Sequence, residues 1–174
     1  MSAVDIVNAD RGMIYAVLEN LREADLTEML ATEANLERLP DVIMRRKVFA
    51  FCAVEYQFGP VAVWGMVQSR SGVGAGFAFG TDHWGVVVLP MVRQIRSFVL
   101  PFLHDSGYHR VEAVAMAHRD DVARFMRLIG AKPEATLRGY GSGGEDFISY
   151  RWLADEHRDT RASLKATQDY HVAH

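Results

Sequence analysis

Glycines in the middle of the chain are the residues whose type and spacing come closest to a nucleotide-binding motif. Gly74 and Gly76 alternate along one segment and Gly80 follows it, which loosely matches the glycine pattern that brings backbone close to a dinucleotide phosphate. The spacing differs from that motif, and two apolar segments joined by a turn precede it. We therefore interpret these glycines as part of a strand with a close backbone neighbour.

Arginines in the centre of the chain are the second candidate for binding chemistry. The formal net charge is -3, but residues 1–41 hold nine acids and three arginines, whereas residues 42–153 hold thirteen bases and nine acids. A mildly basic, arginine-bearing centre suits a phosphorylated small ligand, because the guanidinium fork matches phosphate oxygens. A balanced solvated surface is the alternative. The charge is too small for the strongly basic face of a nucleic-acid-binding protein.

Cysteine, serine and histidine show no arrangement typical of a catalytic or metal site. Cys52 is the single cysteine, which excludes an internal disulfide framework. The seven histidines lack metal-ligand spacing such as HExxH, so we expect no metal. Residues 141–144 lack the spacing and the strand-to-helix setting of a nucleophile elbow and predict a turn.

The composition is that of one globular domain. Apolar residues make up 49% of the 174 residues and charged residues 24%. No uninterrupted apolar run approaches ~18 residues, so we expect no membrane span. The acidic N-terminal segment lacks the basic region of a signal peptide. A cytoplasmic location is the resulting expectation.

The first half of the chain is predicted to contain a strand, then helices, then three antiparallel strands. Asp10 is a candidate cap for the first helix, whose apolar residues recur at helical spacing. A change to β-branched and aromatic residues at Val48 marks the start of the main sheet. The expected segments are a strand at 5–9, helical stripes at 13–21 and 26–30, a short helix at 42–47, and strands at 48–57, 61–68 and 73–79.

The second half is predicted to contain a helix, a strand, a helix and two closing strands. An apolar stripe from Val92 to Leu103 predicts the first helix, with Pro90 in its first turn and a kink at Pro101. The remaining segments are a strand at 110–116, a helix at 118–130 and strands at 135–140 and 146–153. Helices packed on a mixed sheet are the expected architecture.

Four segments of the second half resemble the GCN5-related N-acetyltransferase (GNAT) superfamily. They are residues 110–116, 119–132, 134–140 and 146–150, and the element order over 5–153 also agrees with the family. Residues 21–26 are similar to GNAT-like proteins of tailed phages, some described as internal virion proteins. The resemblance implies one α/β domain of GNAT type over residues 1–153, with a mixed, mostly antiparallel twisted sheet flanked by helices. A polar tail at 154–174 would follow.

The resemblance also implies a site for acetyl-CoA, whose pyrophosphate the family holds on a glycine-containing loop at a helix N-terminus. Val88, Pro90 and Arg93 fit the lead-in to this loop, with Arg96 and Phe98 at its glycine positions. A second register places the loop at 87–92, again without glycine. The two arginines would meet phosphates as charges or would be solvated helix residues. The implied cofactor contacts are Phe79, Val87, Val88, Arg93, Arg96 and Arg119.

Catalytic residues are implied on the same basis. Many family members protonate the leaving thiolate with a tyrosine four residues before the glycine that ends the corresponding helix. Met126 stands there and cannot donate a proton, so Tyr140 or Tyr150 would have to substitute. The base that deprotonates an amine would be Glu55, on the first hairpin strand, or His83, after the third strand.

Two functions remain as alternatives from the sequence. An acyl-CoA-dependent N-acyltransferase would transfer an acetyl group to a small-molecule or peptide amine, mainly by positioning the reactants. Backbone N–H groups of the third strand would polarise the thioester. A non-catalytic GNAT-fold protein of a phage virion, or of its morphogenesis, would instead bind other virion proteins, in the host cytoplasm or the virion. The missing glycines and Met126 favour this second function.

Overall fold

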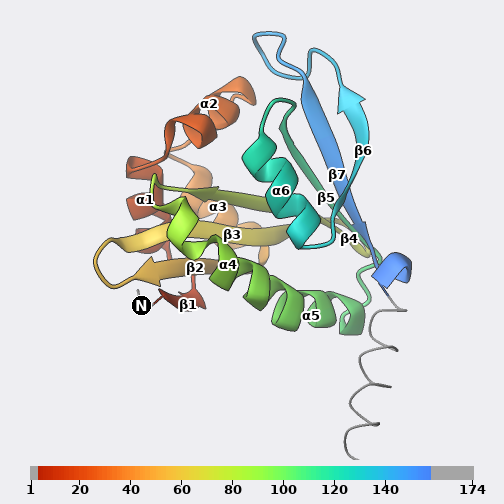
Figure 1. Ribbon diagram of the computed structural model, residues 1–174, viewed down its shortest axis with the longest axis horizontal. Helices are drawn as coiled ribbons and strands as arrows, with labels where there is room; N and C mark the ends of the chain where they lie inside the picture. Colours follow the sequence, from red (N-terminus) through yellow and green to blue (C-terminus); the bar gives the residue numbers. More distant parts are fainter. Residues whose placement is uncertain (1–3, 158–174) are drawn as a thin grey trace, which may run out of the picture.

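Segments rich in β-branched and aromatic residues form a seven-stranded mixed sheet in the computed structural model, which describes residues 4–157 (Figure 1). The strand order is β1-β2-β3-β4-β5-β7-β6, and all neighbours are antiparallel except β4 and β5. The bounds are β1 Val4–Asn8, β2 Lys47–Glu55, β3 Gly59–Arg70, β4 Val73–Gly80, β5 Arg110–Met116, β6 Lys132–Leu137 and β7 Phe147–Leu153. The predicted strands are therefore confirmed, with shifts at their ends.

Helices cover both faces of this sheet (Figure 1). Their bounds are α1 Arg11–Glu19, α2 Glu23–Ala31, α3 Leu39–Arg46, α4 Trp84–Gln94, α5 Leu100–Asp105 and α6 Asp120–Leu128. On one face, Ile14 and Val17 of α1 pack with Phe79 of the sheet. On the other face, Val87 of α4 and Phe125 of α6 belong to a second, larger core layer.

The predicted cap of the first helix is present, and the structure adds a break between the first two helices. Asp10 caps α1 because its Oδ1 accepts a hydrogen bond from the Met13 N–H at 2.8 Å. Between α1 and α2 the chain leaves helical geometry, and Leu21 pairs with Thr81 in an isolated β-bridge. This bridge places the start of α2 beside the end of β4.

The helix that follows β4 begins earlier than the sequence predicts. α4 starts at Trp84 and runs through a π-helical turn, Ile95–Val99, directly into α5. Pro90 therefore lies inside the helix and not in its first turn, which corrects the prediction, whereas Pro101 lies in the first turn of α5. Burial of one apolar face on the sheet outweighs the cost of a helical proline.

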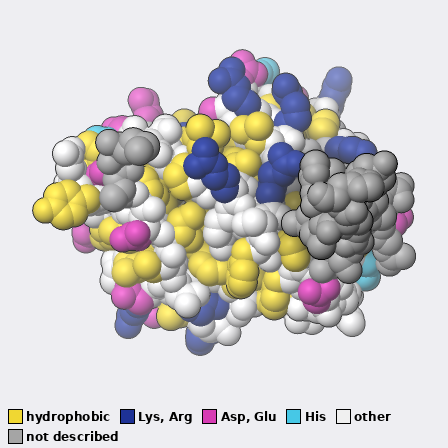
Figure 2. All heavy atoms as spheres, turned by 60° about the horizontal axis from the view of Figure 1, so that its bottom comes forward, with side chains coloured by type: hydrophobic (Ala, Val, Ile, Leu, Met, Phe, Trp, Pro, Cys, Tyr) yellow, Lys and Arg dark blue, Asp and Glu magenta, His cyan; other side chains and the backbone are white. Residues whose placement is uncertain are grey.

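The same continuous helix changes the expectation about membrane spans. It contains 22 residues, Trp84–Asp105, and is long and apolar enough to cross a membrane by length and composition. Its inner face packs on the sheet through Val87, whereas Val86, Leu89 and Phe98 remain exposed. Figure 2 shows the side of the molecule on which exposed hydrophobic side chains lie among basic and polar ones.

The chain continues to pack on the sheet after β7 ends. Ala154 is buried, and a short 3-10 helix, Asp155–His157, follows. Glu156 forms ion pairs with Arg151 and Lys132 at 2.8 and 2.9 Å. The first residues of the segment predicted as a tail therefore contact the domain. The rest of that segment, 158–174, lies outside the described residues.

Candidate functional site

A cleft opens where the two parallel strands at the centre of the sheet diverge. Residues 73–75 of β4 pair with residues 110–112 of β5, and the two strands then separate, so β5, β6 and β7 lean away from the rest of the sheet (Figure 1). The cavity there has a volume of about 150 Å³. Its walls are mainly apolar and include Phe77, Val99, Val111, Phe125, Met126 and Tyr150.

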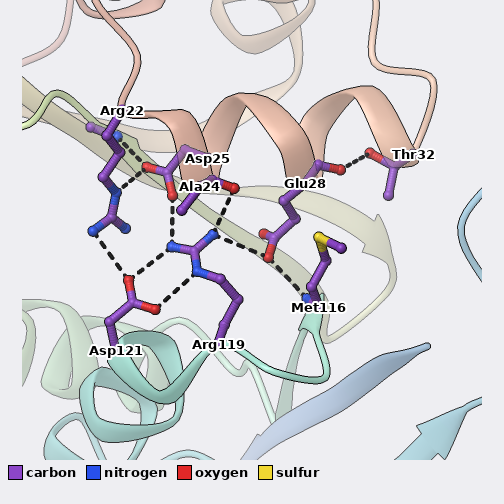
Figure 3. Close-up of polar contacts among 9 residues, drawn as sticks. Arg22, Ala24, Asp25, Glu28, Thr32, Met116, Arg119 and Asp121 are labelled. Atoms are coloured by element: carbon purple, nitrogen blue, oxygen red, sulfur yellow. Dashed lines mark hydrogen bonds and ion pairs between the residues drawn. The ribbon is translucent and has the colours of Figure 1, made fainter. Parts of the chain in front are cut away.

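Helix α2 reaches the wide end of this cleft with two carboxylates (Figure 3). Asp25 and Glu28 are three residues apart and therefore lie on one face of the helix. The Gly80 N–H, at the last residue of β4, donates to Asp25 Oδ2 at 2.8 Å. The Met116 N–H, at the last residue of β5, donates to Glu28 Oε2 at 2.9 Å. Each strand end is therefore capped by a side chain of α2.

Two arginines connect these carboxylates to the start of α6 (Figure 3). Arg119 contacts Asp25 and Asp121 at 2.8 Å and Glu28 at 3.4 Å. Arg22 contacts Asp25 at 2.8 Å and Asp121 at 3.1 Å. We call Arg22, Asp25, Glu28, Arg119 and Asp121 the α2 clasp. It holds two guanidiniums and three carboxylates, a formal charge of -1.

Burial and ion pairing shift the pKa values of these groups in different directions. Burial raises the pKa of Glu28, although the Met116 N–H and Arg119 oppose this. A hydrogen bond from Arg119 lowers the pKa of Asp121 to about 2. Burial acts to lower the pKa of Arg119, but hydrogen bonds to Asp121 and Asp25 outweigh it and the net pKa is raised. Ion pairing therefore stabilises the charged forms of Asp121 and Arg119, whereas burial disfavours the charged form of Glu28.

The cavity wall also carries one buried tyrosine. Tyr150 of β7 lies opposite Ala113 of β5, and its side chain lines the cavity. Burial, followed by the charge of Glu28, raises the pKa of Tyr150 above its ordinary value. Tyr150 therefore keeps its phenolic proton at neutral pH and can act as a hydrogen-bond donor.

The predicted placement of the phosphate loop is wrong. Both registers, 87–92 and the one through Val88 and Arg96, fall inside the continuous helix, where backbone N–H groups serve helical hydrogen bonds. Val87 is fully buried, and Arg93 and Arg96 are exposed away from the helix N-terminus. The connection from β4 to α4 instead consists of Thr81, Asp82 and His83.

The other two predicted cofactor contacts, Arg119 and Phe79, lie in different parts of the molecule. Arg119 is part of the clasp and contacts Asp25, which lines the cavity, although Arg119 itself does not line it. Phe79 is buried in the core layer with α1, where its ring stacks on that of Phe77, and it does not line the cavity. Phe77, two residues earlier, lines the cavity as Trp84 does. The roles of these residues toward acetyl-CoA stay predictions.

The three predicted catalytic residues lie away from the cavity walls. Glu55 is buried, and its Oε2 accepts hydrogen bonds from the N–H groups of Gln57 and Phe58 at 2.7 and 3.0 Å, which caps the β2–β3 turn. His83 stacks on the Phe58 ring with a centroid distance of 3.6 Å. The two proposed bases thus flank one hairpin. Tyr140 is 51% exposed in the β6–β7 loop.

Sequence reasoning missed most of the clasp because its members are far apart in the chain. Asp25 and Arg119 are separated by 94 residues, and neither has a neighbour that marks it as buried. The spacing of Asp25 and Glu28 on one helix face was the available signal. Within residues 4–157, no three His, Cys, Asp or Glu side chains are grouped to hold a metal ion. Burial raises the pKa of the Cys52 thiol to about 12, which makes it a poor nucleophile.

Solved structures with this architecture are GNAT acetyltransferases, and the chain has their fold. Ard1 from Thermoplasma volcanium aligns with a TM-score of 0.70 at 15% identity, over 87% of this chain and 97% of that chain. A GNAT-family acetyltransferase from Bacillus anthracis aligns with a TM-score of 0.65 at 14% identity, over 89% and 99% of the two chains. YncA from Salmonella typhimurium, solved with its cofactor acetyl-CoA, aligns with a TM-score of 0.64 at 13% identity, over 90% and 96%.

Sequence comparison adds no closer relative. No protein-family model matches the chain, and no curated protein gives a significant match. The predicted fold, a single α/β domain with a mixed sheet flanked by helices, is confirmed. At identities of 13 to 15%, the similarity concerns the fold alone.

Proposed function

We propose that this protein is an acyl-CoA-dependent N-acyltransferase, with acetyl-CoA as donor and a small-molecule or peptide amine as acceptor, acting in the cytoplasm. The observation that carries the proposal is the apolar cleft between β4 and β5, with the buried Tyr150 and the partly buried carboxylate of Glu28 on its walls. An extended acyl chain fits such a cleft. The negative clasp at its mouth does not match a pyrophosphate unless α2 moves.

Two residues of the cleft are suited to the proton transfers of this reaction. We assign Glu28 as the base that takes a proton from the amine once the amine has bound and α2 has returned to the cleft, because burial there raises its pKa and brings its basicity closer to neutral pH. We assign Tyr150 as the acid that protonates the leaving thiolate, in the role that Met126 cannot fill. Backbone N–H groups on the inner edge of β4 would polarise the acyl carbonyl. Acetyl-CoA, when bound, supplies the activated acyl group.

Replacing Tyr150 by phenylalanine tests this assignment. We expect acetyl-CoA to bind the wild type in calorimetry and to release free CoA with at least one amine of a panel. Tyr150→Phe should lower kcat at least tenfold and leave the Kd for acetyl-CoA unchanged, because only a proton donor is lost. Tyr140→Phe is the matched control and should retain activity. Absence of binding at millimolar acetyl-CoA would exclude the acyltransferase.

A second function is favoured by the closed cleft. Met126 in the position of the family's acid, the absence of a glycine-containing phosphate loop and the clasp across the mouth are all expected of a GNAT-fold protein without catalysis. Such a protein would serve binding or assembly, and the similarity of residues 21–26 to phage proteins suggests a virion or its morphogenesis. Calorimetry without heat, together with co-purification of virion proteins, would support this function.

A further inference from the structure

The α2 clasp occupies hydrogen-bonding positions that the divergence of two strands leaves open. Where β4 and β5 separate, the N–H groups of Gly80 and Met116 no longer have a strand partner across the cleft. A backbone donor away from water requires an acceptor. The carboxylates of Asp25 and Glu28 supply one each, at 2.8 and 2.9 Å.

The clasp is tied to both sides of the cleft and to both helices that flank its mouth. Arg119 lies between Asp25 and Asp121, with a side chain only 10% exposed. Arg22 contacts the same two carboxylates, and its guanidinium lies 4.4 Å from the ring centre of Trp84, the first residue of α4. One turn of α2 therefore joins the end of β4, the end of β5, α4 and α6.

Withdrawal of α2 would change the chemistry of the mouth. Asp25, Glu28 and Arg22 belong to α2 or directly precede it and would move together. Arg119 and Asp121 would stay, along with the two unpaired backbone N–H donors. The net negative charge would leave with α2, so hydrogen-bond acceptors and anions would be repelled less.

We propose that α2 is a displaceable clasp whose two carboxylates stand in for the acceptor atoms of a ligand. The ligand class is an elongated apolar chain that carries amide or phosphate oxygens, as an acyl-pantetheine arm does. The apolar part would enter the cavity, and its acceptors would take over the Gly80 and Met116 N–H groups. The identity of the ligand rests on the proposed function, whereas the closure by α2 does not.

Hydrogen exchange without any ligand tests the closure. Asp121→Asn removes one charge that holds Arg22 and Arg119, and we expect the amides of Gly80 and Met116 to exchange about tenfold faster, as measured by NMR. Asp120→Asn, an exposed acid one residue earlier, is the matched control and should leave both rates unchanged. Asp25→Ala, once circular dichroism has shown that the variant is folded, should increase the two exchange rates further. Equal rates in Asp121→Asn and the wild type would overturn the proposal.

Hydrogen exchange with acetyl-CoA separates the clasp from the proposed function. In the complex, we expect residues 23–31 to exchange faster while Gly80 and Met116 stay protected. Asp121→Asn should bind acetyl-CoA severalfold more tightly than the wild type, because less interaction is lost on opening. Binding without any change in α2 would overturn the clasp but keep the acyltransferase. No binding by either protein would overturn the acyltransferase, and the ligand-free exchange rates would still decide the closure.

Discussion

At the residue scale, two acids of the α2 clasp show how one side-chain type acquires opposite properties. Glu28 lies against the apolar cavity, where desolvation disfavours its charge and raises its pKa. Asp121 lies at the start of α6, where Arg119 stabilises its charge and lowers its pKa to about 2. The environment, and not the residue type, makes Glu28 the candidate base and Asp121 an anchor.

The lowered pKa of Asp121 predicts an acid-sensitive contribution to stability. The pKa of Asp121 is about 2 in the folded protein and 3.8 for an aspartate without partners, as in the unfolded chain. The unfolded chain therefore binds the proton more readily. The stabilisation is therefore fully present above about pH 4 and is lost as the pH falls towards 2. Urea denaturation of wild type and Asp121→Asn between pH 2 and 6 should show curves that converge at low pH. A constant difference across this range would contradict the prediction.

Single residues were the least predictable part of the site. Arg119 was expected to contact a cofactor and lies at the cleft, but Asp25, which it pairs with, precedes it by 94 residues. No local pattern connects two such positions, because only the fold brings them together. Glu55 was correctly placed in the sheet region, yet its carboxylate serves a turn. An acid in a predicted strand could be a catalytic base or could cap a turn, and its residue type does not distinguish these two roles.

At the element scale, the packing of strand β3 against β2 depends on a glycine, Gly65. A Cβ on Gly65 would lie 2.5 Å from the carbonyl oxygen of Phe49 in the neighbouring strand β2. The obstacle is backbone in a paired strand, so a rotamer change cannot relieve it. The close approach of β2 and β3 therefore requires glycine at this position.

Gly65→Ala should destabilise the protein by about 1–3 kcal/mol, the usual cost of overpacking. Gly85→Ala is the control, because a Cβ there meets no atom within 4 Å and the position is helical. Alanine in a helix is favoured over glycine by up to about 1 kcal/mol. The two free energies of unfolding, measured by urea denaturation, should thus change in opposite directions. Similar values would refute the role of backbone contact at Gly65.

Elements were predicted well where one local pattern dominated. The Asp10 cap, the hairpin strands and α6 followed from capping residues and periodicity. The start of α4 did not, because β-branched residues 86–88 and Pro90 locally disfavour a helix. Packing of Val87 on the sheet decides in favour of the helix, and that information is not local.

At the scale of the whole molecule, protection of the backbone is expected to vary from the centre of the sheet to its edge. The middle of β3, residues 61–66, is buried and the strand is paired on both sides, whereas β6 is exposed along nearly all of its residues and, within residues 4–157, pairs with β7 alone. Amide exchange should therefore be slowest in β3 and fastest among the strands in β6. Mass spectrometry of wild-type peptides measures this directly. Equal protection of β6 and β3 would contradict it.

The outer edge of β6, which has no strand partner within residues 4–157, has a consequence for association between molecules. An unpaired strand edge offers N–H and C=O groups to any extended chain, which is a common route to aggregation. β6 begins with Lys132, Pro133 and Glu134, and this combination of charge and a missing donor discourages strand addition. The first residues of β6 therefore oppose the addition of another strand at the rim of the sheet, where the strand itself is exposed.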